Sequence, residues 1–116
     1  MIAVPLEEDG KPFTEHVCDV RDAAEAVLLA MESEAAPGQA FNVAGPESFR
    51  YTEVGPRLSS TTGRPVVEAR CQGIHSYSLS IEKARKLLGY RPRYKVMDSL
   101  EQALAEQALA AAKTKN

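Results

Sequence analysis

Few residues in this sequence have the types and spacing that chemistry at a site requires. The two cysteines, Cys18 and Cys71, lack metal-type spacing, and no His, Cys and Asp residues cluster as metal ligands do. No Ser-His-Asp or Cys-His arrangement has support in the local sequence. The glycines never stand three residues apart, so no glycine-rich loop brings backbone N–H groups to a pyrophosphate. The residues alone therefore predict no nucleophilic, metal or dinucleotide chemistry.

A basic run between residues 83 and 95 is the strongest remaining pattern, because it holds six basic residues with two tyrosines among them. Such a run is typical of a nucleic-acid-binding patch. However, Lys83, Arg85 and Lys86 fall on the outer face of an amphipathic helix, where charge is ordinary. We therefore expect no nucleic-acid partner.

The net charge of −2 conceals a separation of charge along the chain. Residues 1–63 carry 4 basic and 11 acidic side chains, whereas residues 64–95 carry 8 basic and 2 acidic ones. The basic segment could attract an anionic ligand or the acidic half of another copy of the chain.

Length and composition limit the class of protein. A chain of 116 residues with 44% hydrophobic residues suits one globular domain. No run of 18 apolar residues is present, so we expect no membrane span. The acidic N-terminus, MIAVPLEEDGKPF, is unlike a signal peptide, and two lone cysteines are typical of reduced packing residues. These features predict a cytoplasmic protein.

The first predicted helix follows Asp19, whose carboxylate can cap the free N–H groups of the first turn. Pro37 and Gly38 are expected to end this helix. Its predicted inner face has helical spacing and comprises Val20, Ala23, Ala24, Val27, Leu28 and Met31.

Two strands and a second helix are predicted next. QAFNVAG, residues 39–45, is a short apolar run between turn signals and predicts a buried strand. A helix is expected over residues 51–62, with Thr52 as its cap and Gly63 as its end. RPVVEAR, residues 64–70, predicts a second strand, and CQGIHSYS predicts a loop.

Two more helices complete the chain. Ser80 is expected to cap a short helix that ends at Gly89 in the left-handed conformation. Its predicted inner face comprises Ile81, Ala84, Leu87 and Leu88. The last helix is expected to start at Asp98 or Ser99, with a narrow apolar stripe made of Leu100, Ala103, Leu104, Ala108 and Ala111.

The predicted order is α-β-α-β-α-α, which indicates an α/β fold class, or α+β for the chain in isolation. Residues 1–12 are expected to form an extended arm or loop, residues 13–112 a single domain, and residues 113–116 a frayed tail. Two strands cannot make a viable sheet. The missing strands must come from a longer protein, from another copy, or from segments that look like loops.

Three stretches in this order resemble the C-terminal portion of the NAD(P)-dependent epimerase/dehydratase family, the extended short-chain dehydrogenases. They are HVCDVRDAAEAVLLAM, QAFNVAGPESFRYTEV and SIEKARKLLGYRP, the last followed by a helix. Members of that family have a His-Val-x-Asp-Val helix start, a Phe/Tyr-Asn-Val strand and a Lys-Ala-x-x-x-Leu-Gly-Tyr segment that closes the substrate lobe. The resemblance covers roughly residues 13–104 and implies a fragment of a Rossmann-type fold.

The resemblance implies NAD(P) for full-length members, but this chain lacks their Gly-x-x-Gly-x-x-Gly loop and catalytic Tyr-x-x-x-Lys pair. No tyrosine here is followed four residues later by lysine. Without that lysine, nothing in the sequence lowers a tyrosine pKa for proton transfer. We therefore expect no catalytic residues, no cofactor bound by this chain alone, and no redox chemistry without a further nucleotide-binding half.

The resemblance also implies five candidate substrate-binding residues. Arg70 matches the place where nucleotide-sugar members hold a diphosphate, although the usual Arg-Pro-Gly-Asp is Arg70-Cys71-Gln72-Gly73 here. The others match the helix start, the strand asparagine and the loop that faces a sugar-like ligand, and they are His16, Asn42, His75 and Tyr77. Each also has a structural alternative, which is surface charge for Arg70, packing for His16, backbone hydrogen bonding for Asn42 and a solvated loop for His75 and Tyr77. Asp19, Ser80 and Gly89 are expected to have structural roles at helix ends.

Two functions remain open from the sequence. The chain is either the substrate-binding lobe of an NAD(P)-dependent sugar or nucleotide-sugar epimerase, dehydratase or reductase, or a free-standing homodimeric binding module descended from that lobe. In the first case its partner is a missing N-terminal Rossmann half. In the second its partner is a second copy, as a plain or domain-swapped dimer that covers the edge of the strand Phe41–Ala44.

Overall fold

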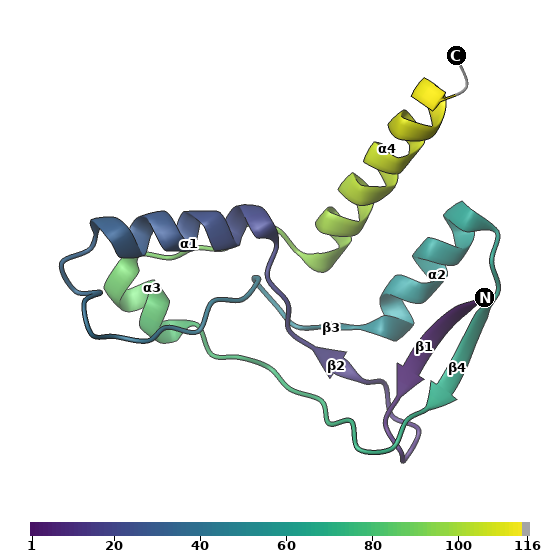
Figure 1. Ribbon diagram of the computed structural model, residues 1–116. Helices are drawn as coiled ribbons and strands as arrows, with labels where there is room; N and C mark the ends of the chain where they lie inside the picture. Colours follow the sequence, from purple (N-terminus) through teal and green to yellow (C-terminus); the bar gives the residue numbers. More distant parts are fainter. Residues whose placement is uncertain (115–116) are drawn as a thin grey trace. The chain divides into compact units, whose positions relative to one another are not determined.

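A computed structural model describes residues 1–114 and has a mixed α/β architecture. The chain separates into two compact units, each built from two stretches of sequence. The first unit comprises Met1–His16 and Glu47–Leu79, and the second comprises Val17–Pro46 and the chain from Ser80 onward. Figure 1 shows the elements, labelled in chain order.

The first unit contains a parallel strand pair covered by a helix. Strand β1 (Ile2–Leu6) pairs with β4 (Val66–Arg70), with Ile2 opposite Val66 and Leu6 opposite Arg70. Helix α2 (Tyr51–Thr62) packs on β1, where Gly55 lies against the buried side chain of Val4. A glycine is needed there because a Cβ atom would lie 2.6 Å from Val4 Cγ2.

A second, shorter strand pair in this unit leads into α2. Strand β2 (Thr14–Glu15) is antiparallel to β3 (Phe49–Arg50), with Thr14 opposite Arg50 and Glu15 opposite Phe49. Because β3 runs directly into α2, the pairing with β2 fixes where the helix begins.

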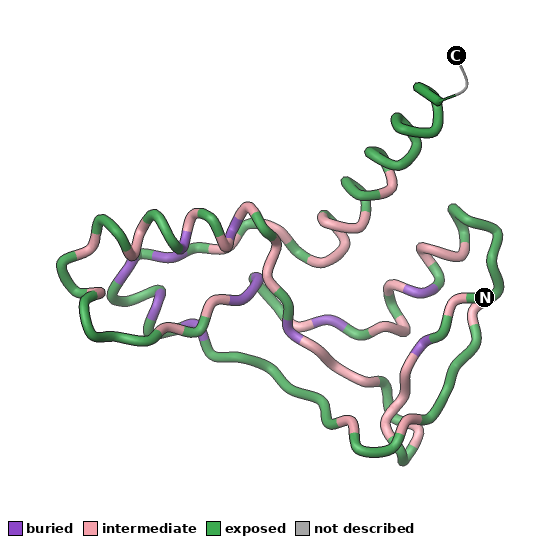
Figure 2. The backbone as a smooth tube through the Cα atoms, viewed as in Figure 1, coloured by how far each residue is buried: buried purple, intermediate pink, exposed green. Residues whose placement is uncertain are grey.

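The second unit packs α1 (Val20–Glu32) against α3 (Glu82–Leu88), and α4 (Val96–Thr114) follows. Figure 2 shows that buried residues occur on α1, on α3 and in the segments beside them, but not on α4. The core of this unit is small, and its buried members are Ala26, Ala44, Ile81, Ala84, Leu88 and Tyr90. The Tyr90 hydroxyl, buried in this core, donates to the Ala44 carbonyl at 2.9 Å.

A buried carboxylate fixes the segment between α3 and α4. Asp22, 1% exposed, accepts from the backbone N–H groups of Arg93, at 3.0 and 3.1 Å, and of Tyr94, at 2.9 Å. Asp19 caps α1 as predicted, since its carboxylate accepts from Arg21 N–H at 2.8 Å. Asp19 therefore caps α1, whereas Asp22, in the first turn of α1, holds the segment between α3 and α4.

Several local predictions are confirmed by the structure. Helix α2 has the predicted bounds, and β4 lies within the predicted strand. Gly63 and Gly89 end α2 and α3 with φ of 68° and 71°, in the left-handed region that favours glycine.

Two predictions about strands are wrong. The expected arm at residues 1–12 contains β1, which was missed because its partner β4 is distant in the sequence. Residues 39–45 form no strand, although Gly45 N–H donates to the Val17 carbonyl at 2.7 Å. Ala44 is nevertheless buried, as a core residue of the second unit.

The predicted inner face of α1 is also wrong. Val20, Val27 and Met31 are 78, 59 and 77% exposed, whereas Asp22 and Ala26 are buried. The small side chain of Ala26 allows the core to pack closely, and the Asp22 carboxylate is stabilised by backbone donors. On α3, Ile81, Ala84 and Leu88 point inward as expected, but Leu87 is 44% exposed.

The predicted ends of the helices differ in detail. Helix α1 ends at Glu32, ahead of Pro37, and α2 begins after Arg50, so Thr52 is not its cap. For α3 the N-cap position is Ile81, whose side chain enters the core, while Ser80 Oγ accepts from Glu82 N–H at 3.5 Å.

Helix α4 begins at Val96, so neither Asp98 nor Ser99 is its cap. The Asp98 carboxylate instead reaches back to accept from Lys95 N–H at 2.8 Å, as in a capping box. Of the tail 113–116, residues 113 and 114 belong to α4, and residues 115–116 lie outside the described part.

No helix within residues 1–114 is long and apolar enough to cross a membrane.

Candidate functional site

In the first unit, the carboxylate of Glu15 lies between the hydroxyl groups of two tyrosines. The Glu15 side chain accepts from the Tyr77 hydroxyl at 3.0 Å and from the Tyr51 hydroxyl. The hydrogen bond to Glu15 and partial burial raise the pKa of Tyr51 to about 12, and the same hydrogen bond raises the pKa of Tyr77. Both tyrosines are therefore neutral donors at physiological pH, with their hydroxyl groups held in place.

Aromatic packing holds Tyr51 in this position. Its ring stacks on Phe13, with centroids 6.0 Å apart and an interplanar angle of 5°. Phe49 meets it edge-on with centroids 5.0 Å apart. Offset stacking and edge-to-face contacts are the favourable geometries for aromatic pairs.

The loop between β4 and α3 is fastened to the N-terminal part of the same unit. The Ser76 hydroxyl and N–H both donate to the Glu7 carboxylate, which lowers the pKa of Glu7, and Ser76 Oγ accepts from Thr14 N–H at 2.9 Å. Farther along, Leu79 N–H donates to Nδ1 of the buried His16 at 3.0 Å. The loop that carries His75 and Tyr77 is thus positioned by specific hydrogen bonds.

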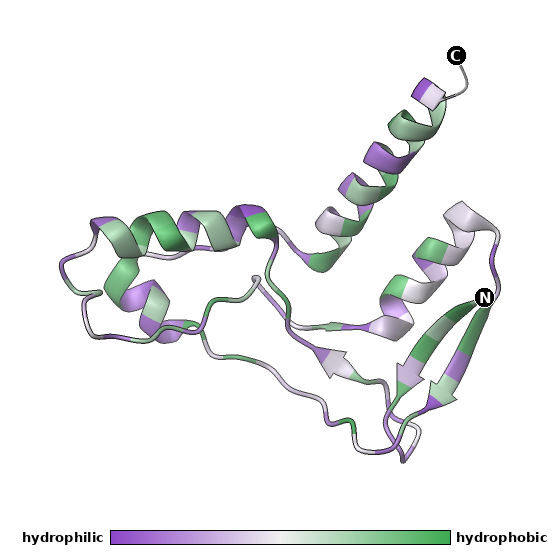
Figure 3. Ribbon diagram, in the orientation of Figure 1, coloured by the Kyte–Doolittle hydropathy of each residue, from purple (hydrophilic) through white to green (hydrophobic). Residues whose placement is uncertain are grey.

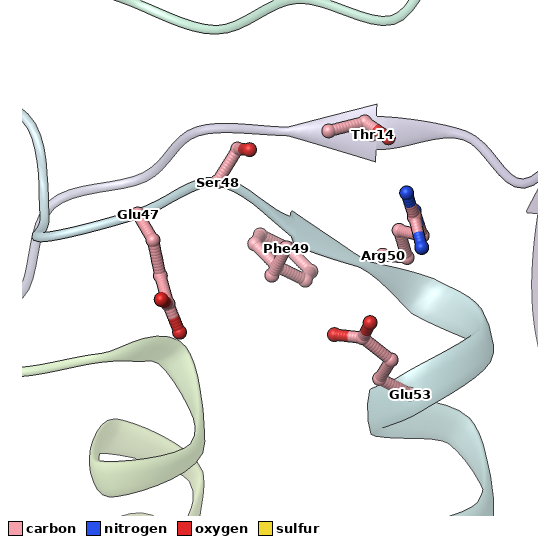
Figure 4. A pocket seen from close by; sticks show the side chains of 6 residues that line it. All are labelled: Thr14, Glu47, Ser48, Phe49, Arg50 and Glu53. Carbon is pink, nitrogen blue, oxygen red and sulfur yellow. The ribbon is translucent and has the colours of Figure 1, made fainter.

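A pocket of about 280 Å³ opens beside the β2–β3 pair. It is lined by Thr14, Glu47, Ser48, Phe49, Arg50 and Glu53. Figure 4 shows the Phe49 ring between the side chains of Glu47 and Glu53. The backbone pairing of Thr14 with Arg50 brings the two sides of the pocket together.

The lining of this pocket suits a ligand rich in hydroxyl groups. Carboxylates such as Glu47 and Glu53 accept hydrogen bonds from hydroxyls, and the Arg50 guanidinium donates to their oxygens. The Phe49 ring is buried and packs edge-on against Tyr51, so the surface of the pocket is mainly polar. Two carboxylates against one guanidinium disfavour a phosphate group in the same place.

The five predicted site residues occupy different surroundings. His16 and Tyr77 lie in the Glu15 region of the first unit, and His75 is an exposed residue of the same loop. Arg70 ends β4, and its guanidinium lies beside Gly10, where a Cβ atom would be 3.1 Å from Nη2. Asn42 belongs to the second unit, where its side chain donates to the Ser80 carbonyl at 3.4 Å.

Sequence reasoning missed the residues that organise this unit, namely Glu15, Tyr51, Glu47, Arg50 and Glu53. Glu15 and Tyr51 are separated by a long stretch of chain and meet only because β2 pairs with β3. A weak signal was present in the regular spacing of Glu47, Arg50 and Glu53 around a helix start. Within residues 1–114, no group of three or more His, Cys, Asp or Glu side chains is placed to hold a metal ion.

Comparison with known proteins finds similar solved structures. No family model and no curated protein matches the sequence. Among solved structures, a short-chain dehydrogenase/reductase superfamily protein from Agrobacterium tumefaciens with bound NAD is 29% identical, with a TM-score of 0.85. The match covers 97% of this chain and 35% of that protein.

More distant structures share the fold. UDP-glucuronic acid 4-epimerase from Bacillus cereus in complex with NAD is 22% identical, with a TM-score of 0.65, over 84% of this chain and 30% of that one. dTDP-glucose 4,6-dehydratase from Bacillus anthracis in complex with NAD is 17% identical, with a TM-score of 0.66, over 90% of this chain and 34% of that one. The chain spans about a third of these proteins, and the family resemblance that its motifs predict is confirmed.

Proposed function

We propose that this chain, whose structure matches a part of NAD-dependent short-chain dehydrogenase/reductase proteins, is the substrate-binding part of a sugar or nucleotide-sugar epimerase, dehydratase or reductase. The pocket beside β2 and β3 supports this proposal, because its two carboxylates and one guanidinium suit a polyhydroxylated ligand. Its role is to bind the sugar and determine specificity.

We also propose a cytoplasmic location for the protein. Both cysteines, Cys18 and Cys71, are free thiols, as is usual in a reducing compartment.

The described residues do not fit a dinucleotide. A dinucleotide cradle joins a strand to a helix start through closely spaced glycines. Here β1 is followed by a turn in which Gly10 N–H donates to the Glu7 carbonyl at 2.8 Å, and β4 is followed by a loop. We therefore derive no redox step for this chain alone.

The geometry assigns separate tasks to the residues of the first unit. Glu53 and Arg50 line the pocket and would orient sugar hydroxyls. Glu15 fixes Tyr51 and Tyr77 as neutral hydrogen-bond donors next to the β2–β3 pair. Arg70 is not among the pocket-lining residues, so a diphosphate contact by Arg70 would have to be made outside this pocket.

Titration of the full chain with free sugars tests the proposal. We expect a neutral hexose to bind with a dissociation constant of about 1 mM, and Glu53→Gln to weaken that binding roughly tenfold by removing a charged acceptor. The matched control is Glu68→Gln, an exposed glutamate on β4. NMR chemical-shift perturbation measures both affinities.

Two results would count against this function. Sugar binding that is the same in Glu53→Gln and in the wild type would exclude the pocket as the site. Micromolar binding of NAD(H) to the full chain in titration calorimetry would contradict the inference that this chain lacks a dinucleotide site.

A further inference from the structure

The loop between β4 and α3, residues 71–79, is held by hydrogen bonds more than by apolar packing. Residues 75–79 are exposed, and Figure 3 shows no continuous hydrophobic stretch along this loop. Ser76 Oγ accepts from Thr14 N–H at 2.9 Å, and Tyr77 N–H donates to the Thr14 carbonyl at 3.0 Å. The position of the loop therefore depends on a few specific hydrogen bonds.

A buried histidine makes one of these hydrogen bonds at the end of the loop. Leu79 N–H donates to Nδ1 of His16 at 3.0 Å, and His16 is 8% exposed. A neutral imidazole accepts with one ring nitrogen and donates with the other, so this contact requires the tautomer with hydrogen on Nε2. An imidazolium carries hydrogen on both nitrogens and cannot accept from Leu79 N–H.

The other titratable groups that hold the loop keep one charge state between about pH 5 and 8, where histidine changes its own. Glu7 accepts from the hydroxyl and N–H of Ser76, which lowers the pKa of Glu7. The hydrogen bonds to Glu15 raise the pKa of Tyr51 to about 12 and also raise the pKa of Tyr77. Two ionised carboxylates and two neutral tyrosines therefore surround the loop throughout this range.

We propose that protonation of His16 releases the Leu79 end of this loop, which gives the first unit a pH-sensitive switch. At neutral and alkaline pH the imidazole accepts from Leu79 N–H and holds the loop in place. At mildly acidic pH the imidazolium and the N–H group are two donors facing each other, and the hydrogen bond is lost. This inference concerns how the loop is held and does not depend on the sugar site proposed above.

Hydrogen exchange of the full chain, followed by NMR, tests the switch. Between about pH 8 and pH 5 we expect the protection factor of the Leu79 amide to fall roughly tenfold, as the loss of one hydrogen bond allows. The amide of Cys71 donates to the Leu6 carbonyl at 3.0 Å and serves as the internal reference, whose protection factor should not change. An equal fall at both amides would mean that the whole unit opens and would overturn the proposal.

Two variants separate the hydrogen bond from its titration. In His16→Asn, the asparagine Oδ1 replaces Nδ1 as the acceptor but takes up no proton in this range, so the protection of Leu79 should not vary with pH. His75→Asn is the matched control, because it changes an exposed histidine of the same loop, and it should keep the pH dependence of the wild type. An unchanged fall in His16→Asn would overturn the proposal.

The nitrogen chemical shifts of the wild-type imidazole rings give a reading that needs no variant. We expect His16 to carry hydrogen on Nε2 near pH 8 and to be an imidazolium near pH 5. A His16 ring that stays neutral at about pH 5, or a Leu79 protection factor that stays constant while the ring is protonated, would overturn the switch.

Discussion

The carboxylate of Asp19 accepts hydrogen bonds from the backbone and guanidinium of Arg21 and from the hydroxyl of Ser99, at the start of α4. The Arg21 guanidinium also lies over the Tyr94 ring, 3.5 Å from its centroid. Bonding to the Arg21 guanidinium, and then to Ser99, holds the pKa of Asp19 well below its usual range. A single residue therefore caps α1 and ties it to the first turn of α4.

The lowered pKa of Asp19 predicts a specific dependence of stability on pH. The ionised carboxylate stabilises the folded chain above the pKa of an unfolded aspartate, about 3.9, and this contribution is lost as the pH falls below it. Asp19→Asn should cost about 1 kcal/mol at neutral pH, because asparagine still caps the helix but loses the ion pair. Urea unfolding monitored by circular dichroism at several pH values measures the difference.

Comparison with the variant isolates the contribution of Asp19, because other carboxylates titrate equally in both proteins. The gap in unfolding free energy between wild type and Asp19→Asn should shrink toward acid pH. A gap that stays constant from neutral pH to about pH 3 would show that the Asp19 charge does not stabilise the fold.

At the scale of elements, the contact of α2 with β1 depends on Gly55. Alanine normally favours a helix over glycine by about 1 kcal/mol. Here its Cβ atom would lie 2.6 Å from Val4 Cγ2, so we expect Gly55→Ala to destabilise the chain by about 1–3 kcal/mol. Ser60→Ala, at an exposed position of the same helix, should change stability by less than about 0.5 kcal/mol.

The clash itself can be tested by a double-mutant cycle with Val4→Ala. Removing the Val4 methyl groups makes room for the new Cβ atom, so the double variant should be less destabilised than the sum of the two single variants. Additive losses, measured by urea unfolding, would mean that the helix and the strand are not in close contact at this point.

At the scale of the whole molecule, both compact units are assembled from distant stretches of the chain. A break between Pro46 and Glu47 would separate β1 from β4 and α1 from α3. We therefore expect neither residues 1–46 nor residues 47–116 to fold alone. A mixture of the two fragments should recover the near-ultraviolet circular dichroism of the intact chain. Cooperative thermal unfolding of either fragment alone would contradict this description.

The sequence determined those features that depend on neighbouring residues. The Asp19 cap, the bounds of α2 and the left-handed ends at Gly63 and Gly89 follow from interactions within a few positions of each residue. The three motifs that indicate the short-chain dehydrogenase family are also local patterns, and the structural comparison confirms that indication.

Only the tertiary structure decided which residues meet. Strand β1 looks like a loop in sequence because its partner β4 lies far along the chain, and Glu15 reaches Tyr51 only through the β2–β3 pair. Helical periodicity showed that α1 has an apolar side but not which side packs, because the buried Asp22 is satisfied by backbone groups from the segment before α4. Local interactions fix elements, whereas long-range pairing and the satisfaction of buried polar groups decide how the elements face one another.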